Sequence, residues 1–162
     1  MTPKILAIDP GTMCGWCVRL PLRPESICFR VSGTWNLKLR PKIDPPGLRL
    51  ARFDSYLGQA IHLHSVIPEL VAYEEVCHHS SYKAAHLYGA FIGILQLRCY
   101  QADIECRGYP VGTIKKFATG NGRASKEDMI LAAEKFACRE IGDDNEADAI
   151  CIAELAASGF TS

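Results

Sequence analysis

The sequence predicts an α/β fold in which a mixed sheet of five strands is covered by helices. Two short apolar runs, residues 5–8 and 70–73, have the length and composition of buried strands. From Gly47 onward the apolar positions change to helical spacing, and strand and helix patterns then alternate. The resulting order is three strands, helix, strand, helix, strand and C-terminal helices, which is typical of layered α/β domains.

The N-terminal part is expected to form three strands. The apolar run 5–8 ends at Asp9, and the Pro-Gly pair after it favours a sharp turn. Residues 15–20 predict a second strand that forms a hairpin with the first, and residues 28–37 predict a third. A proline-containing connector over residues 40–46 separates this part from the first helix.

Two amphipathic helices are expected before and after the fourth strand, which is the apolar run 70–73. Apolar residues at helical spacing predict the first over residues 47–64, and Ser80 or Ser81 is expected to cap the second, which extends to about Tyr100. Gly89 and Gly93 lie one turn apart in that second helix, which allows another element to approach it closely there. Its apolar face is wide enough to contact both the sheet and a partner subunit, and a simple core helix is the alternative interpretation.

The C-terminal part is expected to begin with a fifth strand over residues 104–109 and a helical turn over 111–117. A flexible loop over residues 119–122 follows. Ser125 and the acid three residues later form a capping-box pattern for a helix that extends to Glu140 and ends at Gly142. A last helix is expected from residues 143–144 to about 157, with small and apolar side chains on its inner face.

Length and composition are those of one globular domain over residues 1–162, with 48% hydrophobic and 22% charged residues. No apolar run approaches the roughly 20 residues needed to span a bilayer, and no leader pattern is present at the start. We therefore expect a cytoplasmic protein with no membrane partner. The eight cysteines are expected to be reduced. Cys14 and Cys17 lack the second pair that a zinc site needs, so we expect no zinc.

Charge is unevenly distributed although the net charge is zero. Residues 19–52 and 107–126 are basic, whereas the segment from residue 127 to the end is acidic. The basic segments are suited to nucleic-acid phosphates and the acidic segment to cations. Ordinary solvated surface is the alternative interpretation.

Four carboxylates are candidates for one site. Asp9 and Glu74 each end an apolar strand, and neighbouring parallel strands would place them about 5 Å apart at one sheet edge. Asp144 and Asp148 are four residues apart and therefore share a helix face. Such a cluster is repulsive unless divalent cations neutralise it, and oxygen ligands favour Mg²⁺ or Mn²⁺. We expect two ions per site, an arrangement suited to phosphodiester hydrolysis. A turn-capping role for Asp9, and unrelated surface acids, are the alternatives.

Four segments together resemble one known family. They are Ile-Leu-Ala-Ile-Asp-Pro-Gly-Thr (5–12), Val-Ala-Tyr-Glu-Glu-Val (71–76), Ile-Lys-Lys-Phe-Ala-Thr-Gly-Asn-Gly-Arg-Ala-Ser-Lys (114–126) and Asn-Glu-Ala-Asp-Ala (145–149). In this order they resemble the RuvC family of Holliday-junction resolvases, of phage or bacterial type, which has a ribonuclease-H-like fold. The resemblance implies that Asp9, Glu74 and Asp148 bind metal, and that Lys115 and Lys126 are the family's two functional lysines.

The chain departs from the family pattern at two functional positions. The family's remaining metal ligand falls on Asn145, and Asp144, one residue earlier, is the substitute that we expect; the Asn145 carbonyl oxygen is an alternative ligand. An aromatic residue that the family places after the second acid, against bases at the junction, is replaced by Cys77. The candidates for that stacking role here are His78, His79 and Tyr82.

The resemblance further implies a homodimer that presents two acidic sites to a four-way DNA junction and nicks two strands of like polarity. Phosphate contacts are expected from four basic residues, Lys115, Lys116, Arg123 and Lys126, with further backbone contacts from residues 34–52. The alternatives are a ribonuclease-H-like nuclease that acts on RNA or other branched DNA, and a non-catalytic nucleic-acid-binding relative. Actin-like ATPases share the Asp-Pro-Gly-Thr turn but need two such domains, for which 162 residues are too few.

Overall fold

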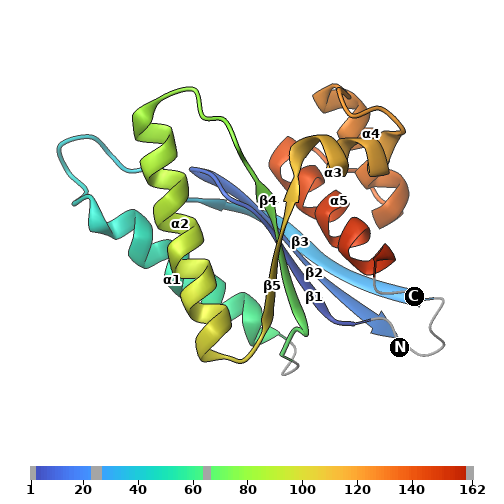
Figure 1. The fold of residues 1–162 in the computed structure, drawn as a ribbon, viewed down its shortest axis with the longest axis horizontal. Coiled ribbons are helices and arrows are strands. Elements are labelled where there is room, and N and C mark those ends of the chain that lie inside the picture. Colours follow the sequence, from blue (N-terminus) through green and yellow to red (C-terminus); the bar gives the residue numbers. More distant parts are fainter. Residues whose placement is uncertain (1–2, 23–26, 64–66, 160–162) are drawn as a thin grey trace.

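The computed structural model describes residues 3–22, 27–63 and 67–159, and it confirms the predicted α/β architecture (Figure 1). The strands are β1 (Ile5–Asp9), β2 (Met13–Leu22), β3 (Ile27–Asn36), β4 (Leu70–Glu75) and β5 (Glu105–Pro110). The helices are α1 (Gly47–Ile61), α2 (Tyr82–Gln101), α3 (Val111–Thr119), α4 (Lys126–Ala137) and α5 (Asp144–Ser158).

The sheet is mixed and has the strand order β3-β2-β1-β4-β5. β1, β2 and β3 form an antiparallel meander, whereas β1, β4 and β5 run parallel. The parallel half requires crossover connections, and α1 and α2 supply them. β1 is therefore the central strand, with covered faces on both sides, as its apolar sequence predicts.

Alternate residues of β1 enter two separate hydrophobic cores on the two faces of the sheet. Leu6 and Ile8 pack with Phe53 of α1 and Phe91 of α2, so these two helices cover one face. Ile5, by contrast, packs with the residues of α3, α4 and α5 on the other face. Figure 1 shows this three-layer arrangement, with α1 and α2 on one side of the sheet and α3 to α5 on the other.

Side-chain caps fix where three helices begin. The Ser81 hydroxyl accepts a hydrogen bond from the Ala84 N–H at 3.2 Å, at the start of α2. At α4 the predicted capping box is present, because Ser125 and Asp128 each bond the other's backbone N–H. Asp143 precedes α5 as its cap rather than opening the helix.

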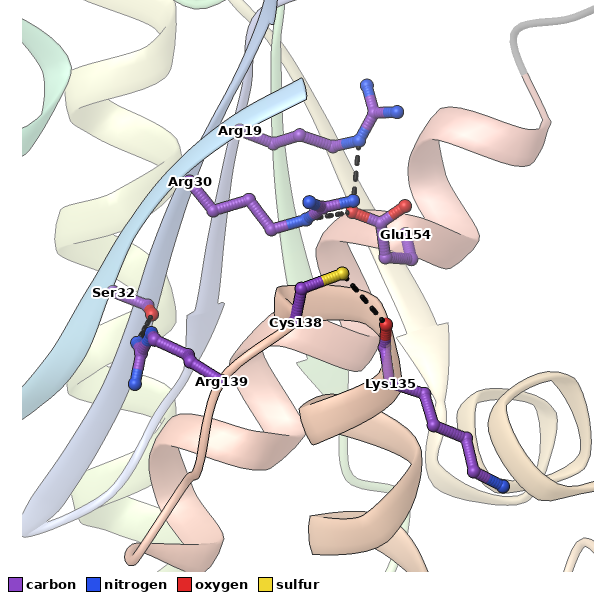
Figure 2. A network of polar contacts seen from close by, with 7 residues as sticks. All are labelled: Arg19, Arg30, Ser32, Lys135, Cys138, Arg139 and Glu154. Atoms are coloured by element: carbon purple, nitrogen blue, oxygen red, sulfur yellow. Dashed lines mark hydrogen bonds and ion pairs between the residues drawn. The ribbon is translucent and has the colours of Figure 1, made fainter. Parts of the chain in front are cut away.

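Buried ion pairs attach α5 to the antiparallel half of the sheet. Arg19 of β2 and Arg30 of β3 both donate to Glu154 Oε1, at 3.0 and 2.7 Å (Figure 2). Eight positions earlier in α5, Glu146 accepts a hydrogen bond from Ser32 Oγ at 2.8 Å and another from Arg139 at 2.5 Å. Arg139 also donates to Ser32, as Figure 2 shows. These contacts hold the helix at two levels along the strands.

Several boundaries differ from the sequence-based expectation. α4 ends at Ala137 rather than at Glu140, because Cys138 adopts a left-handed conformation with φ of 54°. The expected helical turn after β5 is a nine-residue helix, α3. α1 ends at Ile61, and the predicted end at residue 64 lies outside the described residues.

No described element makes the close approach to α2 that Gly89 and Gly93 allow. A Cβ built on Gly89 or Gly93 has no other part of the described chain within 4 Å, so both glycines face open space. Among the described residues, no helix has the length and apolar character needed to cross a membrane.

Candidate active site

β1 and β4 bring two carboxylates to the same edge of the sheet. They are parallel neighbours in which Ile8 pairs with Tyr73, so Asp9 and Glu74 follow at the same level. Both strands deliver their acid where the apolar run ends, which confirms the predicted strand adjacency. The turn after Asp9 directs the chain away into β2, and Asp9 and Glu74 are both half-buried at this edge.

α5 brings a third carboxylate to this edge. Asp148 lies in the second turn of the helix, and its side chain faces Asp9 and Glu74. One carboxylate oxygen from each of the three residues lies within 4.8 Å of the other two. Residues 139 positions apart in the chain thus form one compact acidic triad, which we call the triad below.

Burial and mutual repulsion dominate the electrostatics of the triad. Burial is the largest cause that raises the pKa of Asp9, and the charges of Glu74 and Asp148 raise it further. Burial followed by repulsion from Asp148 raises the pKa of Glu74 to about 7. Burial followed by repulsion from Asp144 raises the pKa of Asp148 to about 6. Three carboxylates held this way favour a bound cation, which removes the repulsion.

Asp144 lies beside the triad but is not one of its three members. Its carboxylate forms an ion pair with Lys126 and accepts a second hydrogen bond from Asn145 Nδ2 at 3.3 Å. The Asn145 amide also donates to Asp143, at 2.9 Å, so its N–H groups face the acids. Asp144 nevertheless acts on the site, because its charge raises the pKa of Asp148. Its role as a fourth metal ligand, and that of Asn145, stay predictions.

A cleft of about 190 Å³ opens beside the triad. Glu74, Asp148, Lys115 and Lys126 line it, together with apolar residues of α3 and α4. Lys115 donates from Nζ to the Ala124 carbonyl at 2.8 Å. Its positive charge offsets part of the rise in the pKa of Glu74 and Asp148. Two of the predicted phosphate-binding residues thus lie beside the acids.

The other two predicted phosphate-binding residues lie on the adjoining surface. Lys116 and Arg123 are both exposed, the first on α3 and the second in the loop between α3 and α4. In residues 19–52, by contrast, several basic side chains are engaged within the chain: Arg40 pairs with Asp44, and Arg49 donates to the Leu37 carbonyl at 2.9 Å. Lys116 and Arg123 therefore add exposed positive charge next to the site.

A tyrosine that sequence reasoning missed supports the end of β4. The Tyr88 hydroxyl donates to the Glu74 carbonyl at 2.9 Å and accepts from the Val76 N–H at 3.1 Å. It thus bridges the backbone on either side of the position where the strand ends. No local pattern marks this residue, because its partners lie twelve or more positions earlier in the chain.

The expected stacking candidates lie in the segment from β4 to α2. His78 and Cys77 are exposed, whereas the His79 ring packs against Tyr88 with centroids 4.9 Å apart. Tyr82 is exposed, and its ring packs against the His86 ring with centroids 4.0 Å apart. Tyr82 and His78 are therefore the exposed side chains among the three stacking candidates.

Cys14 and Cys17 enter opposite faces of the sheet. Cys14 belongs to the core under α1 and α2, and Cys17 to the core under α5. Side chains three positions apart on a strand point to opposite faces of the sheet, so these two thiols cannot bind the same ion. Burial raises the pKa of both. Among the described residues, the triad is the group of acidic, histidine or cysteine side chains close enough to hold an ion.

The sequence of this chain matches the model of a known protein family. The family model described as "Crossover junction endodeoxyribonuclease RuvC" matches residues 5–155. The chain belongs to the RuvC family. A RuvC from Sorangium cellulosum is 29% identical, over 97% of this chain and 87% of the relative. A RuvC from Rhodopirellula baltica is 30% identical, over 80% of this chain and 71% of the relative.

Solved structures share the RuvC fold. The Thermus thermophilus RuvC in complex with a Holliday junction substrate superposes with a TM-score of 0.79 at 23% identity, covering 96% of this chain and 95% of that one. The yeast mitochondrial Holliday junction resolvase superposes with a TM-score of 0.66 at 13% identity, covering 96% of this chain and 78% of that one. At these identities the likeness shows the fold, and the expected ribonuclease-H-like architecture is thereby confirmed.

Proposed function

We propose that this protein is a metal-dependent, structure-selective endodeoxyribonuclease that resolves four-way DNA junctions by paired nicking. One observation carries the proposal: a RuvC-family chain brings Asp9, Glu74 and Asp148 together within 4.8 Å at an accessible sheet edge. Binding to DNA alone would gain nothing from acids at this place, because carboxylates repel phosphates. A hydrolytic role gives the cluster a purpose.

The triad fits Mg²⁺ or Mn²⁺. Its donors are carboxylate oxygens, the ligands that these hard cations prefer. Burial, followed by mutual repulsion, raises the pKa of Asp9 and Glu74, and a bound cation would remove the repulsion. When bound, two divalent ions supply an activated water and charge neutralisation at the leaving oxygen. Asp144 is the residue that we propose as an additional ligand, released from Lys126 for that purpose.

The residues around the triad have separate tasks in this proposal. Asp9, Glu74 and Asp148 hold the cations against β1 and β4. Lys115, anchored on the Ala124 carbonyl, places a positive charge in the cleft beside the scissile phosphate. Lys116, Arg123 and Lys126 bind flanking phosphates and orient the DNA without reading its bases.

A homodimer with α2 at its interface completes the proposal. The outer face of α2 from residue 86 to 97 exposes His86, Gly89, Gly93, Gln96 and Leu97, none of them a lysine, arginine or carboxylate. Tyr100 extends this face at 86% exposure, and Leu97 is 55% exposed. The two glycines leave room for a second helix at close range. A two-fold dimer would match the symmetry of a four-way junction.

The test is cleavage of a four-way junction, a flap, a duplex and an RNA–DNA hybrid side by side, with Mg²⁺ and with Mn²⁺. We expect symmetric nicks in the junction and at least about 100-fold slower cleavage of the duplex, the margin that would mark structure selectivity. Preferred cleavage of the hybrid would identify a ribonuclease-H-like activity instead. Binding of the junction without any cleavage would identify a non-catalytic relative.

A further inference from the structure

Gly15 of β2 lies directly beside the triad, between β1 and the first turn of α5. In the antiparallel ladder Gly15 pairs with Asp9, the most deeply buried acid of the triad. On its outer side, the backbone of Asn145 covers it. A Cβ built on Gly15 would lie 1.9 Å from the Asn145 carbonyl oxygen and 2.6 Å from its carbonyl carbon. No side chain larger than hydrogen fits at this contact.

The atoms that meet this Cβ belong to backbone, so they cannot rotate away as a side-chain end would. Real Cβ contacts essentially never fall below 3.0 Å, so the Asn145 carbonyl would have to retreat by about 1 Å or more. The Ala149 methyl group is a third, milder contact at 3.3 Å. The added methyl group would thus displace the first turn of α5 from the sheet.

The rest of α5 is held against such a displacement. Glu154, six positions beyond Asp148, is fixed by two arginines (Figure 2). Glu146 lies inside the displaced turn, so its bonds to Ser32 and Arg139 would be strained. The shift therefore concentrates in the turn that presents Asp148. Asn145 and Asp148 are three positions apart, which is less than one helical turn, so the two residues move together.

We infer that Gly15 is a positioning residue for the triad: its missing side chain lets α5 approach β1 closely enough for Asp148 to share a cation with Asp9 and Glu74. This inference rests on the proposed function. Divalent cations such as Mg²⁺ require oxygen ligands within a few tenths of an ångström of ideal distance. A retreat of about 1 Å removes Asp148 from that range, and displacements of this size lower catalytic rates about 100-fold.

The test is Gly15→Ala, measured first without DNA. We expect its affinity for Mn²⁺, measured by calorimetry, to fall at least about tenfold, and amide hydrogen exchange in residues 144–148 to speed up. Nicking of a four-way junction should fall about 100-fold and recover in part as Mn²⁺ is raised, because the ligand is displaced and not removed. Junction binding without divalent cations should stay within about twofold of wild type, since it depends on phosphate contacts elsewhere.

Two controls separate positioning from general destabilisation. Gly58→Ala adds the same methyl group to α1, where the built Cβ meets nothing within 4 Å, and should leave Mn²⁺ affinity unchanged. Ile61→Val weakens the opposite core by about 1 kcal/mol and should lower stability without changing Mn²⁺ affinity. The double variant Gly15→Ala/Ala149→Gly should stay defective, because the backbone contacts remain.

Wild-type Mn²⁺ affinity in a folded Gly15→Ala protein would overturn the inference. If that variant shows no cooperative unfolding transition, Ala149→Ser takes its place, because it adds one atom to the same contact from the helix side. We expect it to lower Mn²⁺ affinity about threefold, and unchanged affinity would again overturn the inference. A wild-type protein that binds Mn²⁺ but never nicks junctions would refute the proposed function alone.

Discussion

Tyr88→Phe tests how the end of β4 is held in place for Glu74. The substitution removes one hydroxyl, which donates to the Glu74 carbonyl at 2.9 Å and accepts from the Val76 N–H at 3.1 Å. Each such hydrogen bond contributes about 0.5–1.5 kcal/mol net, so the free energy of unfolding should fall by about 1–3 kcal/mol. With a urea dependence of about 2 kcal/mol per molar, the midpoint of urea unfolding should fall by about 1 M.

The assay is urea unfolding followed by tryptophan fluorescence, combined with junction nicking. The loss of the bridge also frees the backbone that carries Glu74, so nicking should slow about tenfold, as expected for a shift well below 1 Å. Tyr100→Phe is the matched control, because Tyr100 is 86% exposed on the same helix. If Tyr88→Phe and Tyr100→Phe lowered the urea midpoint equally, the bridge would not support the strand end.

Three further predictions concern the dimer, pH and the basic surface. Leu97→Glu should convert the proposed dimer to a monomer in light scattering and abolish paired nicking. Leu131→Glu, also at a leucine that is 55% exposed, should leave the proposed dimer intact, and equal behaviour of the two variants would exclude α2 as the interface. Because the pKa of Glu74 is raised from 4.5 to about 7, the folded metal-free protein binds protons more tightly than the unfolded chain. The stability of the metal-free protein should therefore fall as pH rises from 4.5 to about 7. Over the same interval, the increase in melting temperature on adding Mg²⁺ should grow. If that increase did not depend on pH, Glu74 would not be a metal ligand. Lys126→Ala should weaken junction binding and reduce the slope of the logarithm of the binding constant against the logarithm of the salt concentration by about one. An unchanged slope would exclude a phosphate contact by Lys126.

The sequence predicts the triad well because strand ends leave a local trace. An apolar run that stops at an acid marks both Asp9 and Glu74, and parallel pairing of the two strands follows from the crossover between them. Helical spacing places Asp148 on one helix face with Asp144, and the resemblance of residues 145–149 to the family's last motif assigns it to the site. These features depend on residues near one another in the chain, and each is visible without tertiary information.

The surroundings of the triad depend on packing between distant segments and leave no such trace. Helical spacing puts Asp144 on the same face as Asp148, but its ion pair with Lys126 depends on how α4 packs against α5. Gly15 appears in the sequence as an ordinary strand glycine, and its close contact is with a helix 130 positions later. A single sequence contains no signal for contacts of this kind.

The central claim is that the triad is the metal-dependent catalytic site for junction cleavage, and Asp148→Asn tests it most directly. The substitution keeps the size and shape of the side chain and removes its charge. In a single-turnover assay with a labelled four-way junction and Mg²⁺, the variant should nick at least about 1,000-fold more slowly, while binding the junction as tightly as wild type. Nicking at the wild-type rate by a folded Asp148→Asn protein would contradict the account.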